Sequence, residues 1–363
     1  MEEGKLTTAI LGLAGQGQLL ARAAIDTGHF RIKAVADHDP AQSAGLQKLS
    51  TEYRCAAYDD YRQLIIQNQL DCLLVAADIH SCGEHIRTAM KKRFNILKLA
   101  PPARDFEETA ELVKLAEGEN IKFAVANPAR FAQSFSTAHK ILRQGRIEHI
   151  FLIEAFCSVD DRDSAEMPDR HTDPKLAGGG VLLHDCYHII DLILWCFPVP
   201  EQVYSLSTNQ APDKQQRLYR TEDTAVVSMR FTDALIGNLI AFHRSRLGLK
   251  QEFLRVYGKD KVLTVTRGRL TISPAVLTGP ESATDEESVY DDNQLSALTR
   301  LLDNFGLSLI APEQNRLSSS GSENLKNMAV IKSAYLSART GFPEEPGRIL
   351  QMAPGQSQLP ENA

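Results

Sequence analysis

The chain has 363 residues, of which 43% are hydrophobic and 24% are charged. This length suits two domains, and the composition excludes a chain that is disordered, collagen-like or of low complexity throughout. The net charge of -6 gives no indication of a nucleic-acid or anionic-membrane partner, since such partners favour a basic surface.

The sequence does not predict a membrane span or a secretory leader. Its most apolar run, Ile189–Phe197, is far shorter than the roughly 20 residues that cross a bilayer, and it contains Asp191. The acidic start, Met1–Lys5, does not resemble a signal peptide. The six cysteines form no CxxC pair, so we expect reduced thiols in a cytoplasmic protein.

The first third of the chain alternates strand and helix patterns. We expect strands at 7–13, 30–36, 71–77, 95–99 and 121–126, and helices at 19–27, 40–49, 61–67, 85–92 and 105–118. The continuous apolar run at 71–77 is typical of a strand buried on both faces of a parallel sheet. This alternation predicts an α/β fold in which residues 1–126 form a Rossmann domain with a doubly wound parallel sheet.

The pattern changes after residue 126. A helix at 134–144, a strand at 148–157, a polar loop at 158–175 and an apolar helix at 182–197 are followed by mostly strands. These strands are expected at 202–208, 224–231, 236–245, 251–258, 261–266 and 269–273, before helices at 293–306 and 322–340. Residues 127–350 are therefore predicted to form a C-terminal α+β domain with a large, mostly antiparallel open sheet. The polar tail, 351–363, is expected to be disordered.

A glycine-rich segment, Gly12–Leu20, follows the first strand. Gly15 and Gly17 are predicted to form the GxG of a dinucleotide loop, while Leu20 stands where a third glycine would let helix and strand pack closely. Asp37 ends the second strand, where a carboxylate can accept hydrogen bonds from a ribose and repel a 2′-phosphate. It therefore predicts NAD in preference to NADP. The alternative is an ordinary strand–turn–helix with a solvated aspartate.

Two histidines lie in the apolar segment after Gly178–Gly180. His184 and His188 are four residues apart, so on a helix they share one face, and Asp191 lies near the same stripe. Histidine suits proton transfer near neutral pH, which makes this segment a candidate pocket wall. A shared metal ion and a structural role in the core are the alternatives. We assign no metal, because a third ligand is not evident.

Together these features resemble the Gfo/Idh/MocA oxidoreductases over roughly residues 6–345. The segments that carry the resemblance are Gly15–Gly17, VADHDP with Asp37, DCLLVAAD, PxARDFEETAELVKLAE, Arg130-Phe131, GGGVLLHDCYHIIDL, EDTAVVSMRF and the helix containing Ala334–Ala338. The resemblance implies NAD(P)-dependent hydride transfer involving a sugar, inositol, related polyol or keto-sugar. It also implies a homodimer or homotetramer formed through the C-terminal sheet. The implied cofactor-binding residues are Gly12, Gly15, Gln16, Gly17, Gln18, Leu19, Asp37, His38, Ala76, Ala77, Ala100 and Pro101.

The chain departs from the family pattern at the reacting centre. The family's Glu-Lys-Pro signature aligns with Leu99-Ala100-Pro101, so the lysine is replaced by Ala100, and Lys98 is two positions early and expected to point elsewhere. The family's Asp position matches His184, and its general-base histidine matches His188. Loss of a well-placed acid or base costs about 10²–10⁴ in rate. Three interpretations stay open: His184 covers part of the lost roles, the enzyme runs a redox-neutral NAD-dependent glycoside reaction, or the protein binds nucleotide or sugar without turnover.

The predicted catalytic residues are His188 and His184, with the substrate between the nicotinamide and their shared face. The predicted substrate-binding residues are Arg130, Gly179, Gly180, Asp185 and Asp191. For Arg130 the alternative is a salt bridge that ties the two domains together.

Overall fold

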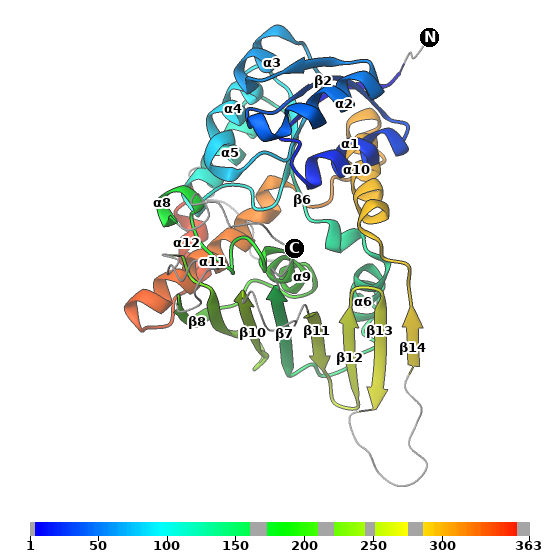
Figure 1. Cartoon of the computed structure of the whole chain (residues 1–363). Helices are drawn as coiled ribbons and strands as arrows, with labels where there is room; N and C mark the ends of the chain where they lie inside the picture. The colour runs from blue at the N-terminus through cyan, green and yellow to red at the C-terminus, as the bar shows by residue number, and fades with distance from the viewer. Residues whose placement is uncertain (1–3, 160–172, 210–220, 244–250, 275–285, 354–363) are drawn as a thin grey trace. The chain divides into compact units, whose positions relative to one another are not determined.

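The computed structural model describes residues 4–159, 173–209, 221–243, 251–274 and 286–353 (Figure 1). Contacts within the chain define two compact units. The first contains residues 1–103, 107–131 and 293–324, and the second contains 104–106, 132–292 and 325–363. The predicted division at residue 126 differs from these units in one main respect, because residues 293–324 belong to the first.

The first unit is built on a six-stranded sheet in which every neighbouring pair is parallel, in the order β3-β2-β1-β4-β5-β6. Its strands are β1 (Leu6–Leu11), β2 (Phe30–Ala36), β3 (Ala56–Tyr58), β4 (Cys72–Val75), β5 (Asn95–Leu99) and β6 (Phe123–Ala126). Its helices are α1 (Gln16–Asp26), η1 (Pro40–Gln42), α2 (Ser43–Tyr53), α3 (Tyr61–Gln67), α4 (Ile79–Lys91), α5 (Phe106–Gly118), η2 (Pro128–Phe131) and α10 (Gln294–Ile310). The predicted Rossmann fold is confirmed.

The core of this unit explains why a late helix joins it. Strand β4 is fully buried, as its continuous apolar run predicted. Helix α10 lies beside α1 (Figure 1). Phe305 of α10 stacks on Phe30 of β2 with ring centroids 6.4 Å apart. A Cβ on Gly306 would lie 3.0 Å from the Phe30 ring, so glycine permits this close approach.

The second unit is built on an eight-stranded sheet in the order β14-β13-β12-β11-β7-β10-β9-β8. Among the strands that the structure describes in this unit, only β7 and β10 pair in parallel, so the predicted, mostly antiparallel sheet is confirmed. Its strands are β7 (Leu152–Val159), β8 (Gln202–Thr208), β9 (Thr224–Arg230), β10 (Ile236–His243), β11 (Gln251–Tyr257), β12 (Lys261–Thr266), β13 (Arg269–Pro274) and β14 (Glu286–Val289). Its helices are α6 (Gln133–Arg143), α8 (Pro174–Ala177), α9 (Tyr187–Cys196), α12 (Pro346–Gln351) and, from Leu325, α11 (Gly321–Thr340).

One predicted helix is wrong at its start. Residues 182–186 form turns, and α9 begins only at Tyr187. Most of the predicted loop at 158–175 and of the predicted tail at 351–363 lies outside the described residues. Within the described part of the chain, no helix combines the length and apolarity needed to cross a bilayer.

Candidate functional site

Two glycines close the loop between β1 and α1 in the first unit. A Cβ on Gly12, whose φ is +83°, would lie 2.5 Å from the backbone nitrogen of Ala77, and a Cβ on Gly17 would lie 2.0 Å from the carbonyl oxygen of Gly12. Gly17 is therefore the residue that lets the helix pack closely on the strand. The expectation that Leu20 stands at this position is wrong. The motif is Gly12-x-Ala14-x-x-Gly17, in which Ala14 replaces the middle glycine.

The start of α1 is open to a ligand. Gly15 is the N-cap residue with a φ of +44°, and the space around its missing Cβ holds no atom within 4 Å. Gln16 and Gln18 are exposed, whereas Leu19 is half-buried and packs against the core. An accessible helix N-terminus of this kind fits the pyrophosphate of a dinucleotide.

Asp37 ties the second strand to this loop. Its Oδ2 accepts a 2.6 Å hydrogen bond from the Leu13 N–H, and its Oδ1 accepts a 2.9 Å hydrogen bond from the Asp39 N–H. The side chain is buried, so the alternative of a solvated aspartate is wrong. A carboxylate has about four acceptor positions, which leaves capacity for ribose hydroxyls. His38 is exposed beside it and contacts the Tyr61 ring edge-on at 5.0 Å.

Ala76 and Ala77 follow β4, and Ala100 and Pro101 follow β5, at the carboxyl edge of the parallel sheet. Ligands bind at this edge in doubly wound folds. The Ala100–Pro101 peptide is cis.

Lys98 is held inside the first unit. Its ammonium is buried and donates a 2.8 Å hydrogen bond to the Leu99 carbonyl. Burial lowers the pKa of Lys98, while nearby Cys82 and Asp78 oppose that change.

His188 of α9 forms the main titratable pair in the second unit. Its Nε2 lies 2.7 Å from Oε2 of Glu252 on β11, and Nε of Arg267 donates to Oε1 of Glu252 at 3.0 Å. Burial alone would lower the pKa of His188, but the hydrogen bond and charge of Glu252 outweigh it and raise that pKa. Burial would likewise raise the pKa of Glu252, yet His188 and Arg267 lower it to about 2. Because Nε2 is engaged, Nδ1 is the atom of His188 that can exchange a proton with a ligand.

A second histidine–carboxylate pair lies close to the first. Nδ1 of His243, at the end of β10, is 2.9 Å from Oδ2 of Asp185. The Cys157 thiol on β7 lies 3.7 Å from the Asp185 carbonyl oxygen, and the charges of His188, Glu252 and Asp185 all act on the pKa of this thiol.

His184 does not share a helix face with His188, and that prediction is wrong. The turns at 182–186 put His184 before the helix, where its Nε2 lies 2.9 Å from the Ala177 carbonyl. The turns persist because both carboxylate oxygens of Glu222 accept backbone N–H groups there, from Gly180 at 2.7 Å and from Leu182 at 3.1 Å.

The glycine triplet is required by close packing. A Cβ on Gly179 would lie 2.1 Å from the Tyr335 hydroxyl, and a Cβ on Gly180 would lie 1.9 Å from the Glu222 carbonyl. The Tyr335 hydroxyl also donates to Oε1 of Glu222 at 2.8 Å. These contacts fix the backbone that leads into α9.

Two predicted substrate contacts are engaged elsewhere. Asp191 is fully buried and accepts a 2.7 Å hydrogen bond from Asn327, so the structure gives it a structural role instead of a ligand contact. Arg130 is 7% exposed and donates to Glu323 at 3.0 Å. The alternative expectation for Arg130 was a salt bridge that ties two domains together. Arg130 does form a salt bridge, but both of its residues belong to the first unit.

Sequence reasoning missed Glu252, Arg267, His243 and Glu222. Each lies at least 34 residues beyond the histidine segment in the chain, and for Glu252 the pairing of β11 with β7 spans that separation. The one available signal was a charged residue within a predicted strand, as at Glu252 in QEFLRVY.

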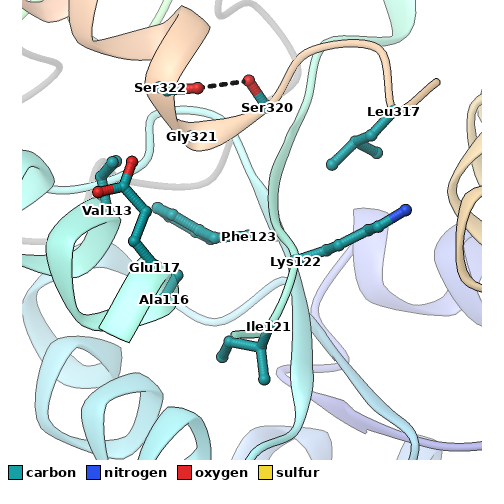
Figure 2. Close-up of a pocket in the computed structure, with 10 residues that line it drawn as sticks. All are labelled: Val113, Ala116, Glu117, Ile121, Lys122, Phe123, Leu317, Ser320, Gly321 and Ser322. Atoms are coloured by element: carbon teal, nitrogen blue, oxygen red, sulfur yellow. Dashed lines mark hydrogen bonds between the residues drawn. The ribbon is translucent and has the colours of Figure 1, made fainter. Parts of the chain in front are cut away.

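The first unit also contains a separate pocket of about 200 Å³ between α5, the start of β6 and the segment before α11 (Figure 2). Phe123 and Val113 supply apolar walls, and Ser320 and Ser322 hydrogen-bond to each other at 2.9 Å. The pocket lies at the amino end of β6, opposite the sheet edge that carries the glycine loop, so it is not part of the nucleotide site.

Comparison with known proteins identifies the chain's relatives. Residues 6–127 match the oxidoreductase family with an NAD-binding Rossmann fold, and residues 135–264 match the GFO/IDH/MocA C-terminal domain. A D-xylose 1-dehydrogenase (NADP(+)) of Haloferax volcanii is 24% identical over 344 residues, covering 92% of this chain and 97% of that protein. A 2,7-anhydro-N-acetylneuraminate hydratase of Escherichia coli is 21% identical over 204 residues, covering 56% of this chain and 52% of that protein.

A solved structure shares the fold. Levoglucosan dehydrogenase, in complex with NADH and levoglucosan, has a TM-score of 0.83 at 16% identity and covers 94% of this chain and 99% of that one. The two matched segments follow one another along the chain and together make up most of it. The protein is therefore a member of the Gfo/Idh/MocA family of NAD-binding oxidoreductases.

Proposed function

We propose that the protein transfers hydride between NAD and a sugar-like polyol or keto-sugar, with His188 as the general acid/base. The observation that carries this proposal is the 2.7 Å pair of His188 and Glu252, which orients the imidazole and makes Nδ1 its proton-exchanging atom. The names of relatives that act on D-xylose and levoglucosan support a sugar-like substrate.

The geometry of the glycine loop supports a dinucleotide. Gly12 and Gly17 would hold the loop against β1, the N-terminus of α1 would bind the pyrophosphate, and Asp37 would accept hydrogen bonds from a ribose. Asp37 and Asp39 bring two carboxylates to this place, which disfavours the 2′-phosphate of NADP. When bound, NAD supplies the hydride acceptor or donor.

The charge of Glu252 bears on the direction of the reaction. Because Glu252 raises the pKa of His188, the imidazole stays protonated to higher pH than a free histidine. A protonated His188 would give its Nδ1 proton to a carbonyl oxygen as that carbonyl is reduced. The same group, once neutral, would accept the hydroxyl proton in the reverse direction. This arrangement favours reduction of a keto-sugar near neutral pH.

The test exchanges His188 for asparagine and compares it with His149→Asn. His149 is exposed in the second unit and has a φ of +47°, a conformation that asparagine tolerates. We expect His188→Asn to lower turnover by about 10²–10⁴ while NADH affinity, measured by fluorescence titration, stays unchanged. Equal loss of turnover in both variants, or full turnover in His188→Asn, refutes the assignment.

A second candidate is a redox-neutral reaction on a glycoside, in which tightly held NAD is reduced and reoxidised within one turnover. Two observations favour it: Ala100 has no proton-transferring group, and one relative is named a hydratase. Denaturing the purified protein and assaying the released nucleotide separates the two candidates. Stoichiometric NAD that survives gel filtration supports the glycoside reaction, whereas freely exchanging NADH supports the dehydrogenase. The third interpretation is binding without turnover, and it requires that the protein turns over no member of a panel of polyols and glycosides.

We also propose that the outer face of the second unit's sheet forms a homodimer or homotetramer. Leu206, Val226, Ile240, Phe156 and Phe253 are direct cross-strand partners on five neighbouring strands, which makes one continuous apolar row. Leu206 is 60% exposed, and Phe156 stacks on Phe253 at 5.5 Å. An apolar row of this length on a sheet face is typical of an interaction surface.

Light scattering tests this surface with Val226→Glu, and Ile66→Glu on α3 of the first unit, where Ile66 is 56% exposed, is the control. We expect Val226→Glu alone to reduce the mass of the oligomer. A monomeric parent protein overturns the proposal. The free state of all six cysteines supports the proposed cytoplasmic location.

A further inference from the structure

Two thiols meet beneath the first turn of α9. Cys157 lies on β7, on the face of the strand that carries the buried residues Ile153 and Ala155, and is 2% exposed. Cys186 is the N-cap residue of α9 and is fully buried. Both are free thiols, and neither has a part in the proposed proton transfer.

The contacts between the two segments are reciprocal. The Cys186 thiol lies 3.9 Å from the Cys157 carbonyl oxygen, and the Cys157 thiol lies 3.7 Å from the carbonyl oxygen of Asp185. The side chain of each cysteine therefore contacts the backbone of the segment that carries the other. A disulfide requires its two sulfur atoms to approach to bonding distance without large backbone movement, and this arrangement supplies the close starting geometry.

The surroundings give the two sulfurs different roles. The neighbouring Cys186 side chain lowers the pKa of Cys157, and the positive charge of His188 adds to this effect against burial and the charges of Glu252 and Asp185. Burial and the neighbouring Cys157 raise the pKa of Cys186. Of the two, Cys157 therefore loses its proton more readily and is the better nucleophile. The His188 side chain next to this pair is 26% exposed.

We propose that Cys157 and Cys186 form a hydroperoxide-responsive dithiol that closes to a disulfide and inactivates the enzyme. The Cys157 thiolate attacks one oxygen of hydrogen peroxide, the O–O bond breaks, and hydroxide leaves, so that Cys157 becomes a sulfenic acid. The Cys186 thiol then attacks that sulfur and the S–O bond breaks. Water leaves with the thiol proton, and the S–S bond forms. The two sulfurs lose two electrons in total, and the peroxide gains them.

The disulfide acts on the reaction through the helix. Cys186 caps α9, and His188 lies two residues later in the first turn, so pulling the cap onto β7 displaces the imidazole from Glu252. A displacement of about 1 Å at a reacting group costs on the order of 10²-fold in rate. This loss of activity rests on the proposed role of His188, whereas formation of the disulfide does not.

Peptide mapping of the whole protein tests the crosslink independently of activity. The purified protein is treated with hydrogen peroxide, its remaining thiols are alkylated, and the digest is analysed by mass spectrometry. We expect a linked peptide that contains Cys157 and Cys186 and disappears after treatment with dithiothreitol. Oxidation confined to Cys55 and Cys196, the two less buried cysteines, overturns the proposal.

Two variants separate the pair from the other thiols. Cys196→Ser lies on the same helix and is the matched control, which we expect to lose activity with peroxide and recover it with dithiothreitol, as the parent does. In Cys186→Ser the resolving thiol is absent, so Cys157 proceeds to the sulfinic acid and dithiothreitol does not restore activity. Full recovery in Cys186→Ser overturns the proposal. If the linked peptide forms but activity persists, the dithiol chemistry stands and the role of His188 fails.

Discussion

Exchanging Glu252 for glutamine tests the pairing at the centre of the proposed site. In the structure His188 and Arg267 lower the pKa of Glu252 from 4.5 to about 2 against the effect of burial. This difference corresponds to about 3 kcal/mol of interaction with the charged carboxylate, shared between the two partners. The Glu252 side chain is only 22% exposed, so little of this energy is screened by solvent.

Glutamine keeps the size of Glu252 but removes its charge, so burial and the charge of Arg267 then lower the pKa of His188, and only Cys157 opposes them. At neutral pH less of the imidazole is protonated, and the tautomer with its proton on Nε2 is no longer enforced. We expect carbonyl reduction at pH 7 to fall by about 10²-fold, the lower end of the range for losing an acid/base group. The pH limb that reports His188 in the oxidation direction should move to lower pH.

The assay is the full pH profile of kcat and kcat/KM in both directions, followed through NADH absorbance. Glu154→Gln is the matched control, because Glu154 is also a strand glutamate paired with an arginine, Arg255, at 3.0 Å. It should leave the profile unchanged. An unshifted profile in Glu252→Gln, or the same shift in both variants, would refute the reasoning that Glu252 sets the protonation of His188.

Three further outcomes follow from the geometry. Gly17→Ala should lower the unfolding free energy by about 3 kcal/mol and weaken NADH binding, because the added Cβ would lie 2.0 Å from the Gly12 carbonyl oxygen. Calorimetry measures the first effect and fluorescence titration the second. The control is Gly118→Ala, which should not destabilise the protein because the space around Gly118 is open. Asp37→Asn should weaken NAD binding about tenfold and reduce the protein's preference for NAD over NADP, as measured by calorimetric titration with both nucleotides. Unchanged affinities would contradict the contact between Asp37 and the ribose. The stability that Glu252→Gln removes should be largest between pH 4.5 and 6.5. It should decline below 4.5 towards pH 2 as Glu252 is protonated, and decline above 6.5 as His188 loses its proton, in denaturant melts across this range.

The sequence by itself determined the fold of both units. Apolar runs such as 71–77 and the alternation along 202–208 are local signals, because the burial of a strand's faces is encoded in its own residue order. It also determined the glycine segment and the acidic residue after it, since a close backbone approach admits only glycine. The register within that segment was not determined, because Gly12, Gly15 and Gly17 allow more than one assignment. Only the overlap that a Cβ on Gly17 would make with Gly12 decided it.

The tertiary structure alone decided the chemistry around His188. Glu252 and Arg267 lie 64 and 79 residues beyond it in the chain, and the pairing of β11 with β7 brings Glu252 within 2.7 Å. Glu222 likewise holds the turns that keep His184 out of the helix, against a local pattern that favoured one continuous helix. Hydrogen bonds between distant segments overrode local propensity here, because a buried carboxylate must find donors wherever the fold supplies them.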